Sequence, residues 1–146
     1  MSQLNSNTST PVVSIVTLVI CILAIAIDLV LTVLATNNPW SLQPSDAAIL
    51  LYIVGPYLAL AAVAWFGRVS RRLAWVIFLS SLALTVWGLW GAASHAYFYQ
   101  TDPEYRLVQP IGVFLIPLGQ WLGSAFLGVA VESHRRQTSI RKTDHR

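Results

Sequence analysis

Four long apolar segments make up most of this 146-residue sequence, and a basic turn, Gly67-Arg68-Val69-Ser70-Arg71-Arg72, divides them into two pairs. Only 10% of the residues are charged, whereas a soluble domain carries roughly 25%. Because about 20 apolar residues suffice for an α-helix to cross the hydrocarbon core, each segment can span a membrane. We therefore predict an all-α integral membrane protein whose four transmembrane helices form an antiparallel up-down bundle.

The boundaries of the predicted spans follow from turn and cap chemistry. Pro11 suits the first position of a helix, and Asn37-Asn38-Pro39 is typical of a turn. Asp102-Pro103-Glu104 is typical of a helix start, so the fourth helix is expected to begin before it enters lipid. The predicted order is a disordered polar N-terminus at 1–10, a transmembrane domain at 11–132 with spans at about 11–36, 45–66, 73–97 and 107–131, and a basic tail at 133–146.

Basic residues gather in the central turn and in the tail, which predicts the orientation of the chain. Short loops retain Lys and Arg on the cytoplasmic side, so both regions, and with them both termini, are expected to be cytoplasmic. The expected location is a bacterial inner (plasma) membrane. Anionic lipids are expected to contact the basic face, whereas the short tail does not indicate nucleic-acid binding. The predicted lipid contacts are Arg68, Arg71, Arg72, Arg135 and Arg136.

Small residues recur at steps of three and four in every predicted span. Helices in lipid associate through close packing of such residues and through interhelical hydrogen bonds. Gly119 and Gly123 form a GxxxG step, which could face another helix, a second copy or another subunit. The glycines predicted to lie at helix contacts are Gly55, Gly88, Gly112, Gly119 and Gly123.

Asp28 is the one formal charge well inside the apolar spans. A carboxylate in hydrocarbon costs several kcal/mol, so it should be protonated, paired or exposed to a water-filled cavity. No Lys or Arg lies within the spans to pair with it, and we expect it to donate to a backbone carbonyl freed by Pro56. The other polar candidates within the spans are Tyr52, Tyr57, His95 and Gln120.

The sequence lacks the residue patterns of an enzyme: it has no Ser-His-Asp arrangement, paired carboxylates, phosphate-binding glycine loop or zinc spacing. A bis-histidine haem site is excluded because the other two histidines, His134 and His145, belong to the tail. From these absences together, no enzyme activity, metal or cofactor is expected. Two hypotheses remain. The first is a protein acting through helix–helix contacts, as a self-assembling protein or an accessory subunit, in a homo- or hetero-oligomer. The alternative is a small proton- or cation-coupled transporter or channel that uses Asp28.

Overall fold

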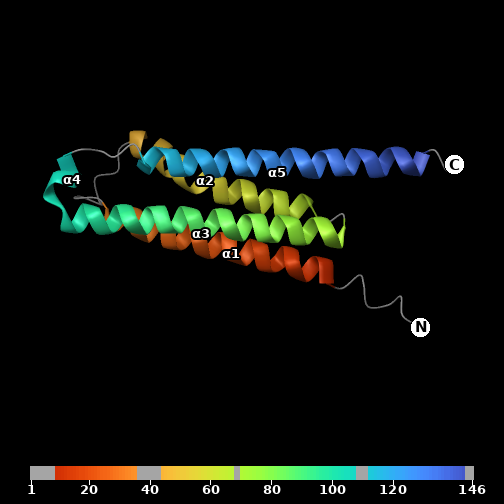
Figure 1. The fold of residues 1–146 in the computed structure, drawn as a ribbon, viewed down its shortest axis with the longest axis horizontal. Coiled ribbons are helices and arrows are strands. Elements are labelled where there is room, and N and C mark those ends of the chain that lie inside the picture. Colours follow the sequence, from red (N-terminus) through yellow and green to blue (C-terminus); the bar gives the residue numbers. More distant parts are fainter. Residues whose placement is uncertain (1–8, 36–43, 68–69, 108–111, 144–146) are drawn as a thin grey trace.

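The computed structural model describes residues 9–35, 44–67, 70–107 and 112–143, and the chain is helical through nearly all of them. Predictions that concern the first eight residues, Arg68 or Arg146 lie outside the described residues. The long helices alternate in direction, so the start of α1, the end of α2, the start of α3 and the end of α5 lie at one end of the bundle (Figure 1). The helices are α1 Ser9–Leu34, α2 Pro44–Phe66, α3 Arg71–Thr101, α4 Pro103–Leu107 and α5 Gly112–Thr143.

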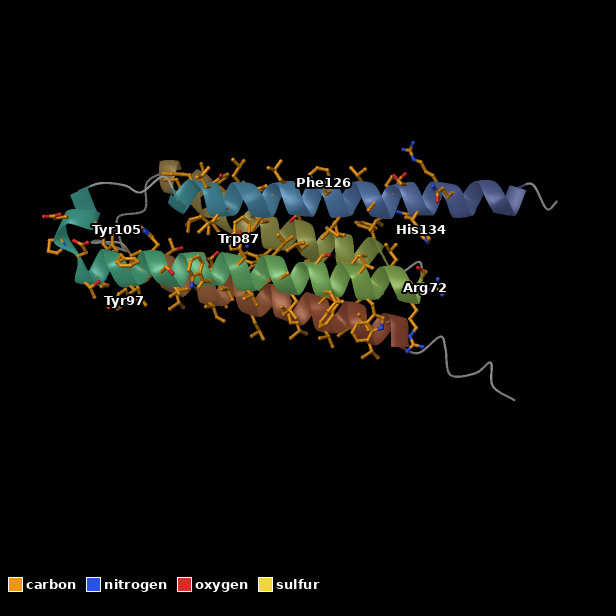
Figure 2. The ribbon with its side chains drawn as sticks, viewed as in Figure 1. Arg72, Trp87, Tyr97, Tyr105, Phe126 and His134 are labelled. Atoms are coloured by element: carbon orange, nitrogen blue, oxygen red, sulfur yellow. The ribbon has the colours of Figure 1, made fainter. Side chains whose placement is uncertain are left out.

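The two ends of the bundle differ in character. We call the end that carries Arg71, Arg72, Arg135 and Arg136 the basic end, and the opposite end, where α4 lies, the loop end (Figures 1 and 2). The four arginine side chains are all exposed. Figure 2 shows Arg72 and His134 at the basic end and Tyr97 and Tyr105 at the loop end.

All four long helices are long and apolar enough to cross a membrane. Only 33% of the most apolar window of α1 and 22% of that of α5 is buried inside the bundle. The outward sides therefore expose Val, Ile, Leu, Phe and Trp side chains. Exposure of so large an apolar surface to water is unfavourable, whereas lipid chains are equally apolar. The prediction of an all-helical bundle with four candidate membrane spans, and hence of a multi-pass membrane protein, is confirmed at this level.

The helices are not arranged as a simple succession of antiparallel neighbours. Helix α1 packs most extensively against α3, to which it runs parallel, and α2 packs against α5, also in parallel. Helices α2 and α3 follow each other in the chain but share the least contact of the packed long helices, and in the described part of the chain α1 and α5 occupy opposite corners. This arrangement places the inward faces of α1 and α3 directly against each other.

Asp102 explains how the chain turns at the loop end. Its backbone N–H donates to the carbonyl of Phe98 at 2.9 Å and closes α3. Its Oδ1 accepts from the N–H of Glu104 at 2.9 Å and of Tyr105 at 3.3 Å, which starts α4. The predicted helix start is thus present, but α4 is a separate five-residue helix, and α5 begins only at Gly112. Residues 108–111 between them are outside the described part.

Helix α5 continues through the region predicted as a tail and ends at Thr143, beyond the other helices (Figure 1). No Gly or Pro follows Gly128 to interrupt it. An ion pair one helical turn apart, between Arg136 Nε and Glu132 Oε1 at 2.8 Å, further supports the helical conformation.

Candidate intramembrane site around Asp28

Three polar side chains from three helices meet inside the bundle. Asp28 of α1, Tyr57 of α2 and Gln120 of α5 are 3%, 0% and 1% exposed. A Cβ atom added at Gly88 of α3 would lie 1.9 Å from Gln120 Nε2 and 2.6 Å from the Tyr57 hydroxyl, so both groups reach the α3 backbone. The Tyr57 hydroxyl also faces the Asp28 carboxyl. We call Asp28, Tyr57 and Gln120 the polar junction.

Hydrogen bonding is unevenly shared within the polar junction. Gln120 is anchored, because its Nε2 donates to the carbonyl of Leu84 at 3.0 Å. In contrast, Asp28 Oδ1 and the Tyr57 hydroxyl have no hydrogen-bond partner within the described residues. Leaving a buried polar group unsatisfied costs about 1–3 kcal/mol, and more if it is charged. Asp28 and Tyr57 are therefore the groups of the junction that can still bind a proton, an ion or a ligand.

A cavity of about 270 Å³ adjoins the polar junction and extends toward the loop end. Asp28 and Gly88 lie on its lining near the junction, whereas His95 and Tyr105 line it near α4. No Lys or Arg is among its lining residues. Most of the wall is apolar, formed by Leu31, Ile53, Trp90, Gly91, Ala92, Phe98, Ile116 and Pro117.

Aromatic side chains meet at the loop end of the cavity. A hydrogen bond of 3.1 Å joins His95 Nδ1 and the Tyr105 hydroxyl, and their ring centroids are 5.6 Å apart. The Phe98 and Tyr105 rings lie 5.5 Å apart. Partial burial raises the pKa of Tyr105, so its phenol remains a neutral hydrogen-bonding group. The Asp102 cap that starts α4 therefore positions Tyr105 over this part of the cavity.

Buried hydroxyl groups continue from the polar junction toward the basic end. Ser81 and Thr85 of α3 are 1% and 3% exposed, and their oxygens have no hydrogen-bond partner within the described residues. Ser14 and Thr17 of α1 are also buried, and the Thr17 hydroxyl donates to the carbonyl of Val13 at 2.9 Å. We call these four residues the hydroxyl row. Asp28 thus lies between the cavity and the hydroxyl row.

Tyr52 lies outside the polar junction. Its hydroxyl donates to the carbonyl of Phe114 at 2.7 Å, and its own carbonyl accepts the indole N–H of Trp121 at 3.1 Å. This is the carbonyl that loses its helical donor because Pro56 has no N–H. Trp121 of α5, rather than Asp28, takes it up, which corrects the partner expected for Asp28. Tyr52 therefore joins α2 to α5 and does not line the cavity.

The glycines of the predicted contacts accept large side chains of neighbouring helices. A Cβ added at Gly55 would lie 2.3 Å from the Trp121 ring, and one at Gly119 would lie 2.3 Å from the Trp87 ring, between α3 and α5 (Figure 2). Leu84 of α3 occupies the same place at Gly123, with the nearest atoms at 2.9 Å. The GxxxG step thus faces α3 of the same chain. The surroundings of Gly112 lie outside the described residues.

Gly91 and Tyr105 are cavity residues that were not among the predicted site residues. Gly91 lies one helical turn after Gly88 and accommodates Ile116, whose Cδ1 would be 2.2 Å from an added Cβ. Its spacing from Gly88 could have indicated this position. The position of Tyr105 in the first turn after the Asp102 cap could have indicated that it lies near α3.

Within the residues that the structure describes, no group of three or more His, Cys, Asp or Glu side chains could hold a metal ion. Comparison with protein-family models, curated proteins and solved structures returns no match.

Proposed function

We propose that the protein is a small proton- or cation-coupled transporter in which Asp28 takes up and releases the transported charge. The observation that carries the proposal is the position of Asp28. The carboxyl group is buried, its Oδ1 has no partner within the described residues, and it lies between the cavity and the hydroxyl row.

Because a buried charge is energetically costly, the Asp28 carboxylate should bind a proton or a cation that neutralises it. A carboxylate at the centre of a bilayer costs about 2.5–3.5 kcal/mol on insertion scales, and more on an isolated helix. No Lys or Arg lines the cavity to offset this cost. A proton or a cation bound at Asp28 neutralises the carboxylate, and release of one favours binding of the other. Such competition at one group is the simplest basis for exchange of a cation against protons.

The cavity and the hydroxyl row lie on opposite sides of Asp28, and we propose that they supply access from opposite membrane faces. The cavity extends toward the loop end, and the hydroxyl row, with the unpartnered oxygens of Ser81 and Thr85, continues toward the basic end. Hydroxyl groups can both donate and accept, so they can relay a proton where a cation would not fit. We propose that the cation uses the cavity and that protons use the hydroxyl row.

The interaction hypothesis has less support from the arrangement of the helices. It depended on a small-residue face available to another copy or subunit, but Gly55, Gly119 and Gly123 are occupied by Trp121, Trp87 and Leu84 of the same chain. Assembly into an oligomer, or with a larger complex, remains a prediction from the sequence.

Flux through Asp28→Asn tests the proposed function. Purified protein in liposomes with an acidic interior and a pH-sensitive dye is diluted into solutions of sodium, potassium or an organic ammonium salt. We expect the wild type to dissipate the pH gradient about tenfold faster than Asp28→Asn, because the amide cannot exchange a proton for a cation. Glu132→Gln, which changes an exposed carboxylate of α5, is the matched control and should retain the flux. Equal rates for wild type and Asp28→Asn would refute the proposal.

We also propose that the basic end faces the cytoplasm of a bacterial inner membrane, with both termini on that side and with Arg71, Arg72, Arg135 and Arg136 near anionic lipid headgroups. Lys and Arg of short loops are retained on the cytoplasmic side, and each one near the surface gains about 1 kcal/mol from anionic lipid.

Labelling with a membrane-impermeant maleimide tests this orientation. Thr101→Cys at the loop end should react in intact cells, whereas Ser133→Cys on α5 should react only after permeabilisation. Cys21 is 0% exposed, so the natural sequence should give no background labelling. Reaction of Ser133→Cys in intact cells would invert the proposed orientation.

A further inference from the structure

We infer, building on the proposed function, that the cation bound in the cavity is a small organic amine with one apolar, preferably aromatic, body. The cavity brings a single carboxylate, Asp28, together with a largely apolar wall. A ligand that matches both features carries one positive charge at one end and hydrocarbon over the rest of its surface.

The charge of the lining residues sets the sign of the ligand. Asp28 is the only carboxylate among them, and no Lys or Arg balances it. Asp28 lines the cavity, and a carboxylate can accept hydrogen bonds from an ammonium group. The Tyr57 hydroxyl faces the same carboxyl group from outside the cavity lining. An anionic molecule would be repelled by the carboxylate, and a neutral molecule would bind without forming an ion pair.

The lack of oxygen ligands argues against a bare metal cation. Ca²⁺ takes roughly six to eight oxygen ligands, and Mg²⁺ keeps several water molecules that need hydrogen-bonding partners on the wall. The lining offers Asp28 together with hydroxyl groups of Thr32, Ser94 and Tyr105. The Thr32 hydroxyl already donates to the carbonyl of Asp28 at 2.8 Å, and the Tyr105 hydroxyl is engaged with His95. An ammonium group needs fewer partners, and its hydrocarbon body gains from the apolar wall.

The volume and the aromatic residues set the size and shape of the ligand. An engineered apolar cavity of about 150 Å³ holds a benzene molecule, so about 270 Å³ accommodates a ring with a short chain. Trp90, Phe98 and Tyr105 line the cavity, and aromatic faces attract both apolar rings and cations. The ammonium group is expected at Asp28, and the ring toward Phe98 and Tyr105.

Three probes that share a phenyl ring on a two-carbon chain, but differ in the charge of the head group, test this inference. Binding of phenethylamine, 2-phenylethanol and phenylacetate to the protein in nanodiscs is measured by calorimetry. We expect the amine to bind at least about tenfold more tightly than the alcohol, and the anion not to bind, because a paired charge is worth more than a neutral hydrogen bond. Asp28→Asn should remove the preference for the amine, and Glu132→Gln should retain it.

A second variant tests the cavity independently of the charge. Ala92→Leu places additional volume on the lining while it keeps the carboxylate. It should weaken amine binding by about tenfold, and circular dichroism and size-exclusion behaviour should remain those of the wild type.

The outcomes separate this inference from the proposed function. Equal binding of the three probes would reveal apolar partitioning only and would overturn the inference, as would an unchanged amine preference in Asp28→Asn. Proton flux that requires Asp28 but shows no response to the amine would also overturn it, while the proposed function would stand. Tight, Asp28-dependent amine binding without any flux would instead support the ligand class and refute transport.

Discussion

Alanine at Gly88 is expected to destabilise the bundle by about 2 kcal/mol. The added methyl group would lie 1.9 Å from Gln120 Nε2 and 2.6 Å from the Tyr57 hydroxyl. Gln120 cannot move away without losing its hydrogen bond to the carbonyl of Leu84. Overpacking destabilises by roughly 1–3 kcal/mol, and loss of the interhelical hydrogen bond by roughly 0.6–2 kcal/mol. Replacing glycine by alanine in a helix offsets about 1 kcal/mol of this destabilisation.

Gly128→Ala is the matched control for this substitution. A Cβ at Gly128 would meet only Val63 Cγ2, at the ordinary contact distance of 3.8 Å. This variant should therefore be as stable as the wild type or slightly more stable. The free energy of unfolding is measured by circular dichroism in mixed micelles as the fraction of sodium dodecyl sulfate rises. If Gly88→Ala proved as stable as Gly128→Ala, the convergence of Tyr57 and Gln120 on Gly88 would be wrong.

In the pH range where Asp28 is mostly protonated, the affinity for phenethylamine is expected to fall about tenfold for each unit by which the pH is lowered. A proton and an ammonium ion compete for the same Asp28 carboxylate, and linkage then gives a limiting slope of one between log Kd and pH. The probe itself stays charged in this range, since an alkylammonium group titrates near ~10.4. Across two pH units the affinity should change by about a hundredfold.

His95 is the other group whose protonation could affect a cation in the cavity. Tyr57 of α2 faces Asp28, His95 of α3 and Tyr105 of α4 line the far part of the cavity, and α5 contributes the neutral Gln120. His95→Gln should therefore retain the slope of one if Asp28 is responsible. A flat profile for the wild type, or a slope that disappears in His95→Gln, would contradict competition at Asp28.

The helices themselves could be predicted from the sequence because their signals are local. Apolar length defined the spans, and the Asp102-Pro103-Glu104 pattern indicated the turn at which α4 starts. The neighbours of each helix could not be predicted in this way. Periodicity identifies the inward face of α1 or α3 but does not indicate that these two parallel helices pack against each other. It also does not indicate that the consecutive helices α2 and α3 share less contact than the other packed pairs of long helices.

The candidate site could be predicted only in part for the same reason. Asp28 was evident as an isolated charge, but its neighbours come from α2, α3 and α5. Tyr52 and Tyr57 were predicted together, although five residues at about 100° each place them on different sides of a helix. Tyr57 is buried at the polar junction, whereas Tyr52 joins α2 to α5. The cavity itself depends on how four faces fit, which no single segment encodes.

Helix α5 has 32 residues, so at 1.5 Å per residue it is about 48 Å long, whereas the hydrocarbon core is about 30 Å thick. One continuous rod therefore carries Ile116 on the cavity wall, Gln120 beside Asp28 and Arg135 at the basic end. A tilt of this helix would therefore move residues of the basic end and residues beside Asp28 together, with Pro117 as the point at which the helix can bend. A binding partner that tilts α5 would therefore change the shape of the cavity beside Asp28.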